Sequence, residues 1–164
     1  MTTQDNLKEA FAGESQANRK YHAFAEKAEQ EGYFQAAKLF RAAAAAETVH
    51  AFNHLRVMGG VGSTADNLRS AIAGETAEFR EMYPKFIEQA KKEKAPDAVL
   101  LSFDVANKVE KIHAGLYKKA LDNLGKNEDV DYYVCSICGH TVENSALEIC
   151  PICNAPREMF KKVE

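Results

Sequence analysis

Two glutamate-histidine pairs with the same spacing are the residues of this chain best suited to chemistry. They are Glu47-x-x-His50 and Glu110-x-x-His113. Residues three apart on a helix lie on the same face, so each pair presents a carboxylate and an imidazole to a common point. Groups of these two kinds, placed together, are ligands for a metal ion.

A lone glutamate precedes each pair at a similar distance. Glu14 stands 33 residues before Glu47, and Glu75 stands 35 residues before Glu110; both lone glutamates follow an Ala-Gly dipeptide. The chain therefore carries two copies of one half-site. Helix bundles build two-metal carboxylate sites in this way, with a Glu from each of two helices and a Glu-x-x-His from each of the other two.

The residues around the first pair are small and apolar rather than charged. Ala42–Ala46 precedes Glu47, while Val49 and Phe52 flank His50. An ionised carboxylate in an apolar stripe is costly unless a partner or a metal ion neutralises it. These neighbours favour a buried metal site over a solvated acidic helix face.

All four cysteines fall in the last 30 residues as two Cys-x-x-Cys pairs. This spacing is typical of a metal site in a reducing compartment rather than of a disulfide framework. Gly139 and Asn154 follow the pairs, where a tight turn needs a residue tolerant of positive φ and directs backbone N–H groups at the sulfurs. Four thiolates accept either iron or zinc, so the motif leaves the metal open. The predicted ligands are Cys135, Cys138, Cys150 and Cys153.

The composition is that of a soluble globular protein. The 164 residues are 46% hydrophobic and carry a net charge of -3, so the basic surface of a nucleic-acid-binding protein is missing. The first residues have neither a basic region nor an apolar run, and no apolar stretch approaches the roughly 18 residues of a membrane helix. We expect a cytoplasmic protein without nucleic-acid or membrane partners.

Apolar residues at helical spacing, with glycines and capping residues between them, predict four long helices. Gly32 ends the first helix and Gly59-Gly60 the second, and Pro84 should bend the third. The predicted spans are about 5–31, 33–58, 64–92 and 96–124.

A charged linker separates these helices from the cysteine-rich segment. We predict a helical domain at residues 1–126 and a second, metal-bound domain at residues 127–164. A segment this short cannot build a sufficient core, so a metal must supply most of its folding free energy.

Together these motifs resemble the rubrerythrin family over essentially the full length of the chain. That family combines a ferritin-like four-helix bundle holding a di-iron site with a rubredoxin-like domain holding one iron, and the resemblance favours iron over zinc in the four-cysteine site. The motifs that carry it are Ala12-Gly13-Glu14-Ser15-Gln16, Glu47-x-x-His50, Glu75-x-x-Glu78 with Tyr83-Pro84, Glu110-x-x-His113 and the two Cys-x-x-Cys pairs.

The resemblance also implies roles for individual residues. Glu47 and Glu110 would bridge the two irons, and His50 would exchange with Glu78 when the oxidation state changes. Glu78 is the residue that the internal repeat does not predict, because its counterpart three residues after Glu14 is an alanine. The implied di-iron ligands are Glu14, Glu47, His50, Glu75, Glu78, Glu110 and His113, with Tyr21 and Tyr83 as phenols that hydrogen-bond to ligand carboxylates. His22 and His140 have no convergent partners, and we expect both at the surface.

By the same resemblance the chain is a peroxidase that reduces hydrogen peroxide to water in oxidative-stress defence. Electrons would pass through the rubredoxin-like iron from an external rubredoxin or NAD(P)H-dependent reductase, since the chain has neither a G-x-G-x-x-G motif after a strand nor a P-loop. Two alternatives stay open: a ferroxidase or iron-handling protein, and a regulator bearing a zinc ribbon. The cysteine module argues against iron storage, because storage needs no dedicated electron input.

The connection between the second and third predicted helices is too short for a ferritin-like crossover. Helices of about 26 residues are about 39 Å long, whereas residues 59–63 reach at most about 18 Å. Either the bundle has a different helix order, or hairpins from two chains pack together. The family resemblance favours the second solution, a domain-swapped homodimer.

Overall fold

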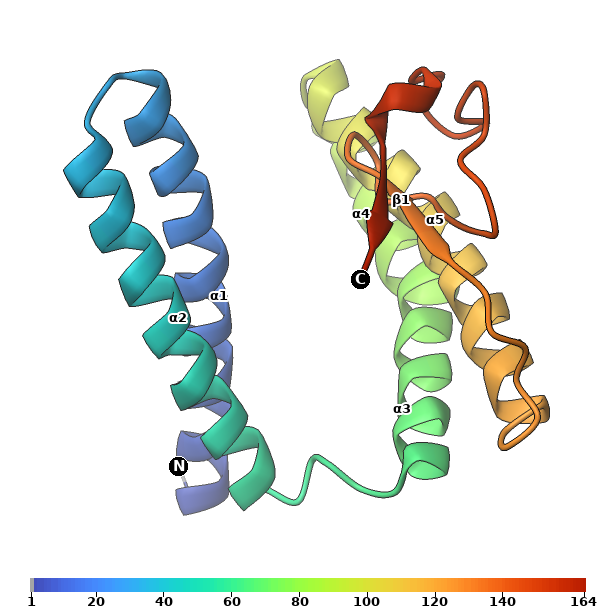
Figure 1. Ribbon diagram of the computed structural model, residues 1–164, viewed down its shortest axis with the longest axis horizontal. Helices are drawn as coiled ribbons and strands as arrows, with labels where there is room; N and C mark the ends of the chain where they lie inside the picture. Colours follow the sequence, from blue (N-terminus) through green and yellow to red (C-terminus); the bar gives the residue numbers. More distant parts are fainter. Residues whose placement is uncertain (1) are drawn as a thin grey trace. The chain divides into compact units, whose positions relative to one another are not determined.

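Two helical hairpins and a small three-stranded sheet make up the chain in its computed structural model, which describes residues 2–164 (Figure 1). By their internal contacts these residues form two compact units. The first ends at Gly62, and the second runs from Ser63 to Glu164. Within the described residues, no helix is both long enough and apolar enough to cross a membrane.

The first unit is an antiparallel hairpin of α1 (Thr3–Gln30) and α2 (Phe34–Val57). Alanines line the interface between the two helices, and Ala25, Ala37 and Ala44 are at most 1% exposed. Such small side chains let the backbones approach closely, which brings the polar groups of the two helices within reach of each other. The hairpin turns at a glycine of positive φ, as the sequence predicts.

The second unit begins with a helix that changes its winding part-way. It consists of α3 (Thr64–Ala77), the π-helical turn η1 (Glu78–Met82) and α4 (Tyr83–Lys92), and it packs against α5 (Asp97–Asp122). Ser63 caps the start of α3, because its hydroxyl accepts a hydrogen bond from the third amide of the helix.

The interruption predicted at Pro84 takes the form of the π-turn directly before it. There the N–H of Tyr83 donates to the carbonyl of Glu78, five residues earlier. Pro84 has no N–H to donate, and its ring would clash with the carbonyl of Arg80 in a straight α-helix, so a wider turn is favoured. A π-turn inserts one extra residue into a helix without breaking it.

The last strands form a small antiparallel sheet of order β2-β1-β3, which we call the cysteine lobe (residues 132–164). Its strands are β1 (Tyr132–Cys135), β2 (Thr141–Glu143) and β3 (Phe160–Val163). Its core is built around Cys135 and Cys150, which are 1% and 0% exposed. So small a core agrees with a lobe that depends on a metal ion to fold.

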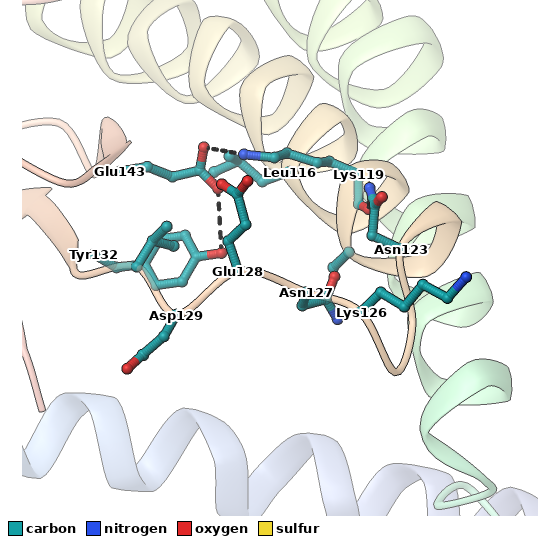
Figure 2. A pocket seen from close by; sticks show the side chains of 11 residues that line it. Leu116, Lys119, Asn123, Lys126, Asn127, Glu128, Asp129, Tyr132 and Glu143 are labelled. Carbon is teal, nitrogen blue, oxygen red and sulfur yellow. Dashed lines mark hydrogen bonds and ion pairs between the residues drawn. The ribbon is translucent and has the colours of Figure 1, made fainter.

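The cysteine lobe packs on α5. The Nζ atom of Lys119 lies 2.6 Å from Oε2 of Glu143, and Figure 2 shows this ion pair beside the pocket that the linker forms with α5. At Gly139 an added Cβ would stand 3.7 Å from Cγ1 of Val109, so this loop sits against the helix. These contacts place α3 to β3 in one compact unit; the boundary expected at residue 126 remains a prediction.

Candidate metal centres

The first half-site lies between α1 and α2. Nδ1 of His50 is 2.9 Å from Oε2 of Glu47 and 3.8 Å from Oε1 of Glu14. One ligand atom from each of the three residues lies within 4.8 Å of the other two. Glu47 and His50 therefore lie on the same face of α2, as their three-residue spacing predicts. Glu14 reaches the same point from α1.

The second half-site reproduces this geometry between α3 and α5. Nδ1 of His113 is 2.8 Å from Oε2 of Glu110 and 3.8 Å from Oε1 of Glu75. The two sets differ in exposure, since the His113 side chain is 26% exposed and that of His50 is 54% exposed. The internal repeat seen in the sequence is thus a repeat of side-chain geometry.

The carboxyl groups of each half-site are held close enough to perturb one another. Burial, with Glu110 as the next cause, raises the pKa of Glu75 to about 7. A hydrogen bond with Glu47 raises the pKa of Glu14, and burial adds to the effect. Paired carboxyls of this kind need either a shared proton or a cation between them. The donor sets therefore fit hard metal ions such as iron.

Glu78 stands outside the cluster of the second half-site. It is not among the residues whose ligand atoms converge there, although burial and then the charge of Glu110 raise its pKa. Its backbone carbonyl starts the π-turn. Glu78 has no counterpart in the first half of the internal repeat, and it lies at the start of the π-turn, which has no counterpart in α1 or α2 either.

Tyr21 and Tyr83 occupy equivalent places, although they stand seven and eight residues after the lone glutamates. Each ring packs in an aromatic trio. The centroids are 6.3 and 6.2 Å apart for Tyr21 with Phe24 and Phe40, and 6.3 Å apart for Tyr83 with both Phe86 and Phe103. The π-turn absorbs the additional residue and keeps the two tyrosines in register.

The hydroxyls of these tyrosines donate no hydrogen bond to a carboxylate within residues 2–164. Burial, followed by the charges of Glu110, Glu78 and Glu75, raises the pKa of Tyr83. Tyr83 therefore lies close to the carboxylates of the second half-site, and its predicted bond to a ligand remains a prediction.

Asn18 is a buried polar residue beside the first half-site that the sequence reading did not single out. Its Nδ2 donates to the carbonyl of Ala44 at 2.7 Å and to Oγ1 of Thr48 at 2.8 Å. The side chain is 8% exposed and joins α1 to α2 one turn beyond Glu14. Asn18 stands four residues after Glu14 and therefore on the same helix face, and this spacing could have marked it in the sequence as a neighbour of the site.

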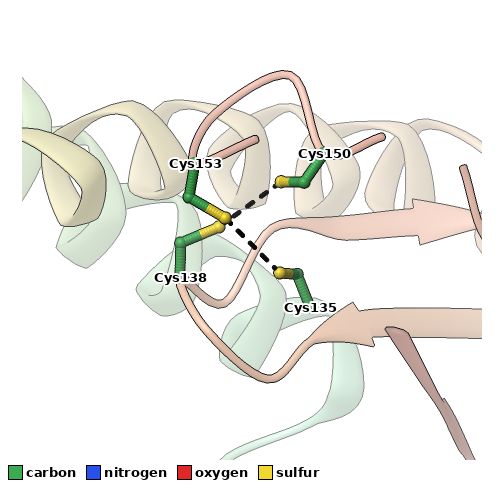
Figure 3. Close-up of side chains that lie close together, drawn as sticks. All are labelled: Cys135, Cys138, Cys150 and Cys153. Carbon is green, nitrogen blue, oxygen red and sulfur yellow. Dashed lines mark hydrogen bonds between the residues drawn. The ribbon is translucent and has the colours of Figure 1, made fainter. Parts of the chain in front are cut away.

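The four cysteines converge in the cysteine lobe (Figure 3). Sγ of Cys135 is 3.7 Å from Sγ of Cys153, and Sγ of Cys138 is 3.6 Å from Sγ of Cys150. All four are free thiols, which is the arrangement of a tetrahedral metal site rather than of disulfides.

Backbone N–H groups point at these sulfurs, in turns that contain the positive φ of Gly139 and Asn154. The N–H of His140 faces Cys138, and the N–H of Ala155 faces Cys153. Burial raises the pKa of both thiols, so their ionised forms need a cation to stabilise them. The set fits one iron ion.

The surface position expected for His140 is wrong. Its side chain is 7% exposed and packs edge-on against Phe160, with ring centroids 6.2 Å apart. Burial, with His113 as the next cause, lowers its pKa. The turn after Cys138 directs this side chain between the sheet and α5, a placement that depends on the folded lobe.

Comparison with known proteins identifies the chain. Residues 5–121 match the Rubrerythrin family model, and residues 133–161 match the model described as "Rubrerythrin, rubredoxin-like domain". The chain belongs to the rubrerythrin family. As in that family, it is mainly helical with a small rubredoxin-like region, and its metal sites are those of a di-iron protein with a four-cysteine iron.

Relatives that match over most of their own length support this membership. The chain is 37% identical to Rubrerythrin-2 of Clostridium acetobutylicum over 97% of this chain and 95% of that protein. It is 36% identical to Nigerythrin of Nitratidesulfovibrio vulgaris, covering 97% and 85% of the two chains. Among solved structures, the fully reduced, all-ferrous state of nigerythrin matches with a TM-score of 0.61 at 34% identity, covering 99% and 87%.

Proposed function

We propose that this rubrerythrin-family chain is a peroxidase that reduces hydrogen peroxide to water. The observation that carries the proposal is the packing of the cysteine lobe on α5, the helix that supplies Glu110 and His113. An electron-carrying site and a carboxylate-imidazole cluster thus belong to one compact unit. A protein that only stores iron needs no such electron input.

The proposal assigns the bundle metal to the two half-sites together with Glu78. Iron bound there supplies two electrons, one from each ion, which is the number that one peroxide O–O bond needs. Glu78 lies near Glu110 but outside the cluster, the place expected of a ligand that joins the site in only one oxidation state. The proposed ligands are Glu14, Glu47, His50, Glu75, Glu78, Glu110 and His113 for the bundle, and Cys135, Cys138, Cys150 and Cys153 for the third iron.

Reduction of hydrogen peroxide to two waters also consumes two protons. Glu78 has a raised pKa because of burial and the charge of Glu110, so it holds a proton more readily than an ordinary glutamate. Tyr83 carries a second exchangeable proton next to the same carboxylates. We propose these two groups as the proton donors of the reaction.

We propose that the complete bundle is a domain-swapped homodimer. The chain between α2 and α3, residues 58–63, reaches at most about 22 Å, whereas the 24 residues of α2 span about 36 Å. Each hairpin also leaves large apolar side chains exposed, such as Phe52 at 51% and Phe86 at 44%. A second hairpin packed on these faces would bury them and bring the complementary half-site.

Electrons must reach the four-cysteine iron from outside the chain. We propose a rubredoxin or an NAD(P)H-dependent reductase as the donor, since none of the described residues forms a nucleotide-binding motif. The proposal places the protein in the cytoplasm, where thiols stay reduced.

Single-turnover and steady-state assays test the proposal together. Anaerobically reduced protein with three irons per chain should consume about one equivalent of hydrogen peroxide per bundle site. Cys150→Ser should keep this single turnover and lose steady turnover from the donor, because a serine oxygen replaces a thiolate in the iron site. Ser136→Ala, an exposed position in the other cysteine turn, between Cys135 and Cys138, is the matched control.

Two outcomes would contradict the proposal. Iron release with oxidation by oxygen, and no peroxide reduction, would indicate an iron-handling protein. Colourless protein with about one zinc per chain, even when produced with ample iron, would indicate a zinc ribbon.

A further inference from the structure

The imidazole of His113 is held at both of its nitrogens. Its Nδ1 faces Glu110 and Glu75, as described above, and its Nε2 lies 3.0 Å from Oγ1 of Thr141 in the cysteine lobe. This contact joins a residue of the second half-site to a residue 28 positions later in the chain. It is the direct polar link between the cluster on α5 and strand β2.

A second contact of Thr141 shows which group donates and which accepts in this hydrogen bond. Oγ1 of Thr141 also lies 3.0 Å from the carbonyl oxygen of Gly139. A carbonyl can only accept, so the hydroxyl proton of Thr141 goes to Gly139. The oxygen of Thr141 therefore accepts a hydrogen bond from Nε2–H of His113, while Nδ1, on the other side of the ring, faces the two carboxyl groups.

The backbone around Thr141 is fixed by the four-cysteine site. Gly139 follows Cys138 directly, has a φ of 82° and donates its N–H to the carbonyl of Cys135. The same loop contacts Val109, the 2% exposed neighbour of Glu110. The position of the Thr141 hydroxyl is thus set by the metal-dependent turn on one side and by α5 on the other.

The equivalent histidine of the first half-site has no such support. His50 repeats the Nδ1 distances, yet its side chain is twice as exposed. The hydrogen bonds found within its own hairpin, residues 3–57, include none to Nε2 of His50. The two half-sites match in their carboxylates and differ in how firmly the imidazole is held.

We propose that Thr141 is a positioning residue for His113. Its hydroxyl, oriented by the Gly139 carbonyl, fixes the Nε2–H form of the imidazole and directs Nδ1 to the bundle metal. Metal-bound histidines commonly donate their second ring N–H in this way, which orients the ring and strengthens the ligand. The inference rests on the ligand role proposed for His113 but not on any peroxidase activity.

Nuclear magnetic resonance of zinc-loaded full-length protein tests the hydrogen bond directly. Zinc is diamagnetic, so the ring N–H proton of His113 can be observed, and its loss in His113→Gln assigns it. In the wild type this proton should exchange slowly with water. Thr141→Val should speed its exchange at least about tenfold, while Thr141→Ser, which keeps the hydroxyl, should retain the protection.

Zinc competition titrations give a second readout. Thr141→Val should weaken zinc binding at the bundle by about 10-fold to 100-fold, and Thr141→Ser by less than about threefold. Thr64→Val is the matched control, because Thr64 is exposed at the start of α3 and is not among the proposed ligands or their hydrogen-bond partners. It should leave the His113 proton protected.

Retention of the metal by the four cysteines shows that a variant lobe has folded. If Thr141→Val loses that metal, Thr141→Ala replaces it, with the same expected results. A protected His113 proton and unchanged zinc affinity in the folded variant would overturn the role of Thr141. Peroxidase assays do not enter this test, so its failure is distinct from failure of the proposed function.

Discussion

Glu75 should make the metal-free protein less stable as the pH rises, and Glu75→Gln isolates that effect. Burial, and then Glu110, raises the pKa of Glu75 from the ordinary 4.5 to about 7. Between these two pH values the folded protein holds a proton that the unfolded chain has released. The free energy of unfolding therefore falls as the pH rises through this window, and is level above it.

The size of the effect follows from the same pKa. A rise from 4.5 to about 7 corresponds to at most about 3 kcal/mol. The Glu75 side chain keeps 19% of its surface exposed, and solvent screens its interactions, so we expect about 1 to 1.5 kcal/mol between pH 5 and pH 8. Glutamine has nearly the same shape and no charge, so this contribution should vanish in the variant.

Urea unfolding followed by circular dichroism measures the difference. Bundle metal is removed under reducing conditions while the four-cysteine metal is retained, and both proteins are unfolded at pH 5 and pH 8. Other carboxyls titrate in both proteins, so only the difference between wild type and variant counts. Glu81→Gln, whose side chain is 70% exposed, is the matched control.

Two results would refute this reasoning. One is an equal pH dependence in the wild type and Glu75→Gln. The other is a wild type that gains stability, relative to the variant, as the pH rises from 5 to 8. Zinc added at pH 8 should remove the wild-type deficit, because the cation takes the place of the shared proton.

Three further predictions follow from the assembly and the packing. Chains with Glu47→Ala and chains with Glu110→Ala should each be inactive, but unfolding and refolding them together should restore about a quarter of wild-type peroxidase activity. Half of random dimers are mixed, and each mixed dimer has one intact site of two. No rescue in verified mixed dimers would indicate a site within one chain. Asn18→Leu should lower the free energy of unfolding by about 2 kcal/mol in urea titrations, because two buried hydrogen bonds are lost. The control Asn53→Ala, at an exposed position, should change the free energy of unfolding by less than about 0.5 kcal/mol. Deleting Glu81 should replace the π-turn by a regular α-turn with the seven-residue spacing found between Glu14 and Tyr21, so helicity should be kept and zinc affinity of the bundle should change by less than about threefold. A fall of at least about tenfold would contradict the idea that the π-turn only absorbs one extra residue.

Local geometry is what the sequence by itself could determine. A glutamate and a histidine three residues apart must share a helix face, so the Glu47-His50 and Glu110-His113 contacts were predictable without any tertiary contact. The same holds for the four cysteines, because two Cys-x-x-Cys turns leave few ways to arrange four thiols around one ion. Glycine and proline positions also placed the helix ends and the interruption near Pro84 correctly.

Contacts between distant segments were decided only by the tertiary structure. The sequence shows Tyr21 and Tyr83 at unequal distances from their glutamates, and only the π-turn makes them equivalent. Likewise, nothing near Thr141 or His140 predicts that one reaches His113 and the other is buried. These placements depend on how the cysteine lobe docks on α5, which is set by packing over many residues rather than by any local pattern.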